Sequence, residues 1–103
     1  MKNMSYDPGA LDAALAAAIG DDKALIAELR QAFLESAERH IDLLSRARCD
    51  ANWELAALRL KGLAASFGAT DMMALADQAA QSAPGDPGAQ RRLRSALAAF
   101  AAG

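Results

Sequence analysis

The chain has 103 residues, of which 53% are hydrophobic, and a formal net charge of −2. A chain of this length forms one core that buries roughly 60–65% of the surface of the unfolded chain, which excludes a second lobe. A negative net charge does not supply the positive field that nucleic-acid binding usually requires, which excludes DNA and RNA as expected partners.

The composition favours α-helix over β-strand. Side chains that branch at Cβ favour strands, and here they are rare because valine is absent. They are Ile19, Ile26, Ile41 and Thr70. We therefore predict an all-α fold.

The first predicted helix covers residues 8–18. Asp7 supplies an N-cap, and Pro8 suits the first helical position because the N–H that proline lacks would have no partner there. Gly20 can adopt the left-handed conformation that ends a helix.

A long second helix is predicted over residues 22–48, with Asp21 and Asp22 as its cap. Its apolar stripe repeats at spacings of three and four residues. The stripe consists of Ile26, Leu29, Phe33, Ala37, His40 and Leu44. We therefore expect His40 to be buried or half-buried on the inner side of this helix.

The third helix is predicted over residues 51–67. Asp50 is the expected N-cap, and Gly68 is the expected end of the helix. The three segments so far are joined by short connections.

The last two helices are separated by a turn at residues 82–85. The fourth begins at Thr70 or Asp71 and lasts to about Ser82. The fifth begins with Asp86-Pro87, a second pair of cap and proline. Its apolar side carries Leu93, Leu97 and Phe100.

Short connections between amphipathic helices make neighbouring helices antiparallel. We therefore predict one domain over residues 1–103, an antiparallel up-down four-helix bundle with an additional short N-terminal helix packed across one end. We expect this domain to be a monomer.

The third helix has a distinct inner and outer face when successive residues are placed about 100° apart. The inner face consists of Trp53, Ala56, Ala57, Leu60, Leu63, Ala64 and Phe67. The outer face consists of Glu54, Leu58, Lys61, Gly62 and Ala65, with Leu55 just beyond it. Leu58 lies almost opposite the inner face, so we expect it to point at solvent.

Gly62 is unusual because glycine inside a helix costs about 1 kcal/mol relative to alanine. Two explanations remain open at this point. A partner could need to approach the backbone closely, or the glycine could allow close packing within the bundle.

The segment of residues 56–69, AALRLKGLAASFGA, resembles the signature helix of histidine-containing phosphotransfer (HPt) domains. That signature typically reads A-H-x-L-K-G, followed by small residues and then G-A. The resemblance extends to the Gly20-Asp21 junction, the long second helix and the helix containing Leu75-Ala76. It covers almost the whole chain.

In that family the motif histidine accepts a phosphoryl group from an aspartate of a response-regulator receiver domain. Leu58 occupies that position here and has no nucleophilic nitrogen. The resemblance therefore implies an HPt-like, pseudo-HPt protein of a two-component phosphorelay that keeps the docking surface without the chemistry.

The implied partner is a receiver domain, with a hybrid histidine kinase as a second candidate. The implied binding residues are Glu54, Leu55, Leu58, Arg59, Lys61, Gly62 and Ala65. Lys61 would lie near the acidic pocket of the receiver, and Gly62 would leave room for it. We expect a modulator of the receiver that is not an enzyme and needs no cofactor.

Other polar residues have a structural and a functional interpretation. His40 is expected to be structural, and a relocated phosphoacceptor is the alternative. Cys49 follows Arg46 and Arg48, whose charge would favour a reactive thiolate, although a plain turn residue is the preferred interpretation. Asp21-Asp22 is explained by helix capping, so no metal site is expected.

Two further groups have simple expected roles. Arg91, Arg92 and Arg94 form a solvated helix face, or else add to a protein contact. Met72 and Met73 are expected to fill gaps in the core beside Trp53 and Phe67.

The single cysteine cannot form an internal disulfide or a zinc site, which indicates a reducing compartment. The start MKNMSYDP lacks the apolar run of a secretion signal, and charges interrupt every later apolar stretch. We therefore expect a cytoplasmic protein with no membrane contact.

Two alternatives to the modulator remain open. The chain could be a functional phosphotransfer protein, acting through His40 or carrying an engineered Leu58 in place of a native histidine. It could also be a self-associating structural module, in which Leu55, Leu58 and Ala65 are buried against a second copy.

Overall fold

Five α-helices follow one another along residues 8–102, the part of the chain that the computed structural model describes. They are α1 (Pro8–Ile19), α2 (Lys23–Arg46), α3 (Asp50–Ser66), α4 (Thr70–Ala80) and α5 (Pro87–Ala102). No strand occurs within those residues, so the predicted all-α class is confirmed there. The N-cap predicted at Asp7 lies outside the described residues.

Local sequence signals explain two of the helix starts. The Asp22 carboxylate accepts a hydrogen bond from the Leu25 N–H at 3.1 Å, and the Asp86 carboxylate accepts one from the Ala89 N–H at 2.8 Å. Each cap satisfies a backbone donor that has no partner inside its helix. Both predicted caps are therefore confirmed.

The predicted cap at Asp50 is wrong. Cys49 is the N-cap of α3, and its backbone is extended, with φ −126° and ψ 162°. The N–H of Trp53 already donates to the Cys49 carbonyl at 3.0 Å, so Asp50 lies within the first helical turn. Its carboxylate there interacts favourably with the helix dipole instead of capping the backbone.

Helix α1 ends at Ile19, one residue later than predicted, and three other helices end earlier than predicted. Helix α2 ends at Arg46 and α4 at Ala80, each two residues early, while α3 ends one residue early at Ser66. Helix α4 has 11 residues and α1 has 12, so the N-terminal helix is not the shortest.

Gly68, between α3 and α4, has a φ of 70° and lies against α1. A Cβ placed on Gly68 would be 2.9 Å from the Cβ of Ala14, a distance at which one of the two must move. The close approach of this loop to α1 therefore depends on a residue without a side chain.

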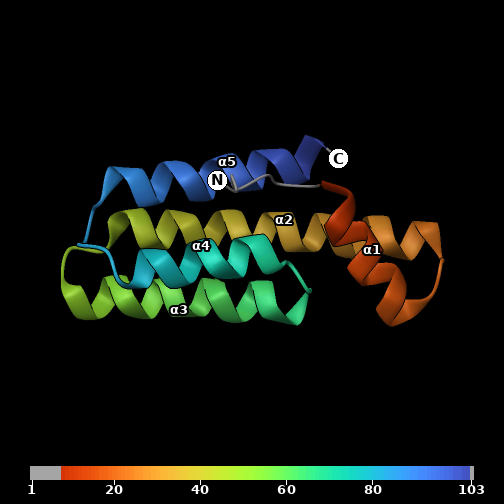
Figure 1. Ribbon diagram of the computed structural model, residues 1–103, viewed down its shortest axis with the longest axis horizontal. Coiled ribbons are helices and arrows are strands. Elements are labelled where there is room, and N and C mark those ends of the chain that lie inside the picture. The colour runs from red at the N-terminus through yellow and green to blue at the C-terminus, as the bar shows by residue number, and fades with distance from the viewer. Residues whose placement is uncertain (1–7, 103) are drawn as a thin grey trace, which may run out of the picture.

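Helices α2, α3, α4 and α5 lie side by side along the longest axis of the molecule, and α1 crosses one end (Figure 1). Helix α2 packs against α3 and α5, and α4 also packs against α3 and α5. Helix α1 packs against α2 and α5. Each of the helices α2 to α5 can therefore bury one face against two neighbouring helices.

Aromatic side chains link these helices at the centre of the core. The ring of Phe33 on α2 lies 5.1 Å from that of Phe67 and 6.3 Å from that of Phe100 on α5. Trp53 on α3 is 1% exposed and donates from Nε1 to the carbonyl of Ala79 on α4 at 2.6 Å. The indole therefore fills the core and also has its polar atom satisfied.

The methionines predicted to fill the core divide between its centre and its margin. Met72 is fully buried, and Met73 is partly buried against the core. No polar or charged residue is buried among the residues whose exposure the structure describes. The fully buried residues there are therefore all apolar, while Oδ1 of Asp12 and Nε of Arg30 are buried as single polar atoms.

Helix α1 is attached by both apolar and polar contacts. Leu11 is 1% and Leu15 is 6% exposed. Arg30 on α2 forms an ion pair with Asp12 on α1 at 3.4 Å, and it also donates to the carbonyl of Phe100. Arg30 thus ties α1, α2 and the end of α5 together.

No helix within residues 8–102 combines the length and the apolar character needed to span a membrane.

Candidate functional site: the outer face of α3

The outer face of α3 presents two large apolar side chains to solvent. Leu58 is 44% exposed and Leu55 is 48% exposed, whereas Ala57 and Leu60 on the inner face are fully buried. The predicted division of this helix is therefore confirmed. Glu54 and Ala65 are exposed as well.

Gly62 lies one turn after Leu58 and is exposed. A Cβ placed on Gly62 would meet no atom of the described residues within 4 Å, apart from the backbone of its own helix. The explanation that Gly62 allows close packing within the bundle is therefore wrong for residues 8–102, because none of their atoms packs against this position. Glycine lowers the stability of the helix here, and no contact within the described part of the molecule compensates for that loss.

Lys61 lies on the flank of this face that borders α4. Its Nζ is 3.1 Å from the carboxylate of Asp77 on α4, and the two side chains are 40% and 48% exposed. An ion pair this exposed contributes little to stability, about 0–1 kcal/mol. The sequence analysis assigned Lys61 to contact with a partner and did not predict its ion pair with Asp77. Local sequence patterns do not show which residues 16 positions apart lie close together.

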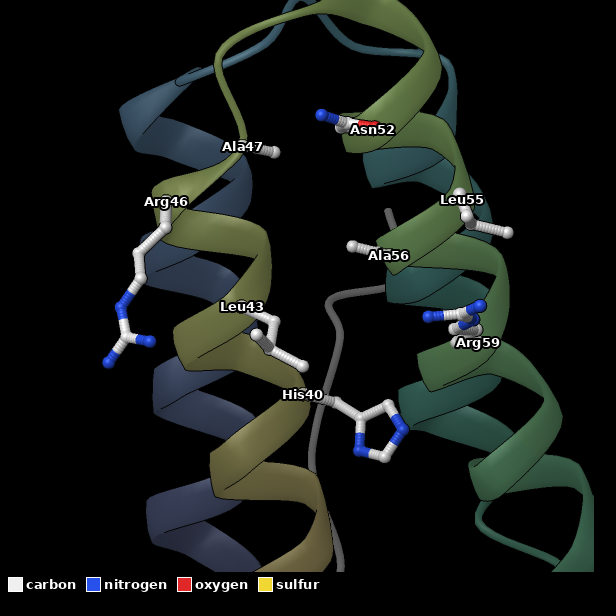
Figure 2. Close-up of a pocket in the computed structure, with 8 residues that line it drawn as sticks. All are labelled: His40, Leu43, Arg46, Ala47, Asn52, Leu55, Ala56 and Arg59. Atoms are coloured by element: carbon white, nitrogen blue, oxygen red, sulfur yellow. The ribbon is translucent and has the colours of Figure 1, made fainter.

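Arg59 lies on the opposite flank and lines a groove between α2 and α3 (Figure 2). The groove has a volume of about 260 Å³. Its walls include His40 and Leu43 from α2 and Leu55, Ala56 and Arg59 from α3.

Leu43 is 52% exposed, more than any other large apolar side chain whose exposure the structure describes, and the sequence did not point to it. It lies on α2 between the inner stripe and the polar face, where the spacing rule gives no clear assignment. Together with Leu55 and Leu58 it forms what we call the apolar patch. The patch spans the groove, since Leu43 and Leu55 line it from opposite helices.

Positive charge borders the groove on both helices. Arg46 on α2 is 3.5 Å from the Asp42 carboxylate, which also pairs with Arg94 on α5 at 3.5 Å. Arg59 makes no ion pair with any residue in the described range. A partner with acidic groups could therefore reach an uncompensated guanidinium here.

His40 is half-buried at the wall of the groove, as predicted, while Phe33, Ala37 and Leu44 of the same stripe are fully buried. Its Nδ1 lies 2.7 Å from the carbonyl oxygen of Ser36. The ring is thus held by its own helix and faces the gap between α2 and α3 (Figure 2).

The remaining candidates do not gather into a site. Cys49 is exposed at the start of α3, and no group of three or more His, Cys, Asp or Glu side chains within the described residues could hold a metal ion. Asp22 acts as a cap. The outer face of α3 with its adjoining groove is therefore the candidate site.

This face exposes apolar side chains, and Leu58 offers no nucleophile for phosphoryl transfer. No protein-family model, curated protein or solved structure matches the chain at a significant level.

Proposed function

We propose that this chain is an HPt-like protein of a two-component phosphorelay that binds a response-regulator receiver domain through the outer face of α3. Its α2–α5 helices would form the up-down four-helix bundle of that family. With Leu58 in place of the acceptor histidine, the protein acts by binding and modulates the receiver without catalysis.

One observation carries the proposal: Gly62 is exposed and helical, and a Cβ added to it would meet no atom of the described residues within 4 Å beyond the backbone of its own helix. Packing within the described molecule gives no reason for a residue that costs about 1 kcal/mol at this position. A partner whose surface approaches the α3 backbone beside Leu58 supplies that reason.

The charges on the two flanks support the same partner. The resemblance implies that a receiver presents an acidic pocket, and Arg59 and Lys61 lie on either side of the Leu58 and Gly62 strip. Lys61 can turn from Asp77 to the partner at low cost, because the pair is exposed.

The test is a calorimetric titration of the folded chain with the isolated receiver domains of its source organism. At least one receiver should bind. The area of such a complex is expected to be modest, below about 1,200 Å² in total, as in transient signalling contacts. Failure of every receiver to bind would contradict the proposal.

A second candidate function is self-association, and the apolar patch favours it. Leu43, Leu55 and Leu58 are each more than two-fifths exposed, and Leu43 and Leu55 line the same groove. Sedimentation velocity at rising concentration separates the two functions, since self-association requires dimers and receiver binding does not.

A further inference from the structure

The groove between α2 and α3 differs in charge from other recesses of residues 8–102. Its lining includes Arg46 and Arg59 and no acidic residue. Four other recesses in that part of the chain each include at least one Asp or Glu. An anion is therefore attracted to this groove, whereas each of the other four presents a carboxylate that would repel it.

Arg59 is the cation that can receive such an anion without losing another contact. Its side chain is exposed and forms no ion pair with any residue in the described range. Arg46, by contrast, lies 3.5 Å from the Asp42 carboxylate and points away from the groove (Figure 2). The charge at the groove that has no partner within residues 8–102 is therefore that of Arg59.

Beside this charge, much of the lining is apolar. Ala47, directly after α2, and Ala56 on α3 point toward each other across the groove (Figure 2), and both are partly buried against the core. Leu43 lines the same groove and is 52% exposed. A hydrocarbon chain in the groove would cover part of that exposed surface, which is favourable because apolar surface leaves water.

The size of the groove limits the ligand to a small molecule. Its volume is about 260 Å³. At about 30 Å³ for each water-sized group, this is room for about eight or nine non-hydrogen atoms. Asn52 and Arg59 both line the groove, and the rise of an α-helix places them about 10 Å apart along α3. A short chain can therefore extend from Arg59 past Ala56 toward Asn52.

We propose that this groove binds a free monoanion with a short hydrocarbon chain, a carboxylate of about six carbon atoms. The carboxylate binds Arg59, whose guanidinium can donate to both oxygens, and the chain packs against Leu43, Ala47 and Ala56. This site goes beyond receiver binding and does not depend on it, because the ligand needs no second protein.

The experiment titrates hexanoate into the full chain, without any receiver, and follows the backbone amides by NMR. The amides of Ala47 and Ala56 should shift and saturate with a Kd of about 1 mM, which is reasonable for so small a ligand. Acetate has the charge without the chain, and hexanol has the chain without the charge. Each should bind at least about tenfold more weakly, and hexylammonium should not bind at the groove.

Two pairs of variants test the two halves of the site. Arg59→Gln should weaken hexanoate binding at least about fivefold, whereas Arg92→Gln, at an exposed arginine of α5 outside the groove, should keep the affinity of the parent. Leu43→Ala should weaken binding several-fold, whereas Leu25→Ala, at an exposed leucine outside the groove, should not. Circular dichroism confirms the fold of each variant.

Three results would overturn the proposal. The first is a shift at Ala47 and Ala56 that never saturates, or that acetate produces at the same concentrations. The second is parent-like affinity in folded Arg59→Gln. The third is binding to vesicles of phosphatidylcholine and phosphatidylglycerol with no saturable binding of free hexanoate, which would make the groove part of a membrane-binding surface.

Discussion

Gly62 shows how one residue can separate binding from stability. Because an added side chain would meet no atom of the described molecule, Gly62→Gln should leave thermal stability unchanged or raise it by up to about 1 kcal/mol through better helix propensity. The same side chain would stand in the path of a receiver. We expect receiver affinity to fall at least about tenfold by calorimetry.

Gly62→Ala is the control for that change. It gains the same helix propensity but adds only one methyl group, so it should stabilise the protein and weaken receiver binding less than glutamine does. Equal affinity for the parent and both variants would remove this strip from the interface.

Leu58 also allows receiver binding and folding stability to be tested separately, because its side chain is exposed. Leu58→Asp should cost within about 0.5 kcal/mol of folding free energy, because the side chain is already 44% exposed. It should also weaken receiver binding, because it places a negative charge against an acidic pocket. Denaturation and titration of the same variant measure the two effects.

Leu25, 38% exposed on α2, provides a matched leucine away from the outer face of α3. Leu25→Asp should keep the affinity of the parent. Equal losses in both variants would point to a general effect of charge and not to docking at Leu58.

At the scale of the element, the loop between α3 and α4 lies close against α1 at Gly68. Gly68→Ala should destabilise the fold for two reasons: a φ of 70°, and a Cβ 2.9 Å from that of Ala14. The backbone strain costs about 1 kcal/mol, and the collision with α1 adds to it. Urea unfolding followed by circular dichroism measures the sum.

Gly85→Ala isolates the first of these costs, because Gly85 has a φ of 81° and open space around its Cβ position. The excess of Gly68→Ala over Gly85→Ala is the contribution of the α1 contact. Ala14→Gly should recover that excess in the double variant, and no recovery would mean that α1 is not held at this loop.

At the scale of the whole molecule, we expect the contacts of Phe33 to make the helices unfold as one cooperative unit. It is fully buried and lies against the rings of Phe67 and Phe100. Phe33→Ala should cost about 3–5 kcal/mol. Because small domains are stable by only about 5–15 kcal/mol, this is a large share of the total.

Chemical denaturation should therefore show one transition for the variant, shifted to much lower denaturant. A separate early transition, with the rest of the fold retained, would show that α1 and the other helices unfold independently. The comparison uses Leu43→Ala, an exposed site where the loss should be small.

The sequence by itself determined the features that depend on local geometry. The all-α class, the caps at Asp22 and Asp86, and the exposure of Leu58 follow from composition, capping residues and a helical period of about 3.6 residues. These signals lie within a few positions of one another. The misassigned cap at Asp50 shows their limit, since Cys49 begins the helix with no side-chain hydrogen bond.

Only the tertiary structure decided what surrounds each exposed residue. The pairing of Lys61 with Asp77, the open space at Gly62 and the groove shared by His40 and Arg59 all depend on how one helix is rotated and shifted against the next. Periodicity tells which side of a helix is buried, but it does not tell which residues of a distant helix lie opposite. The residues that lie beside the two flanks of α3 are therefore decided by the packing of α2 and α4 against it.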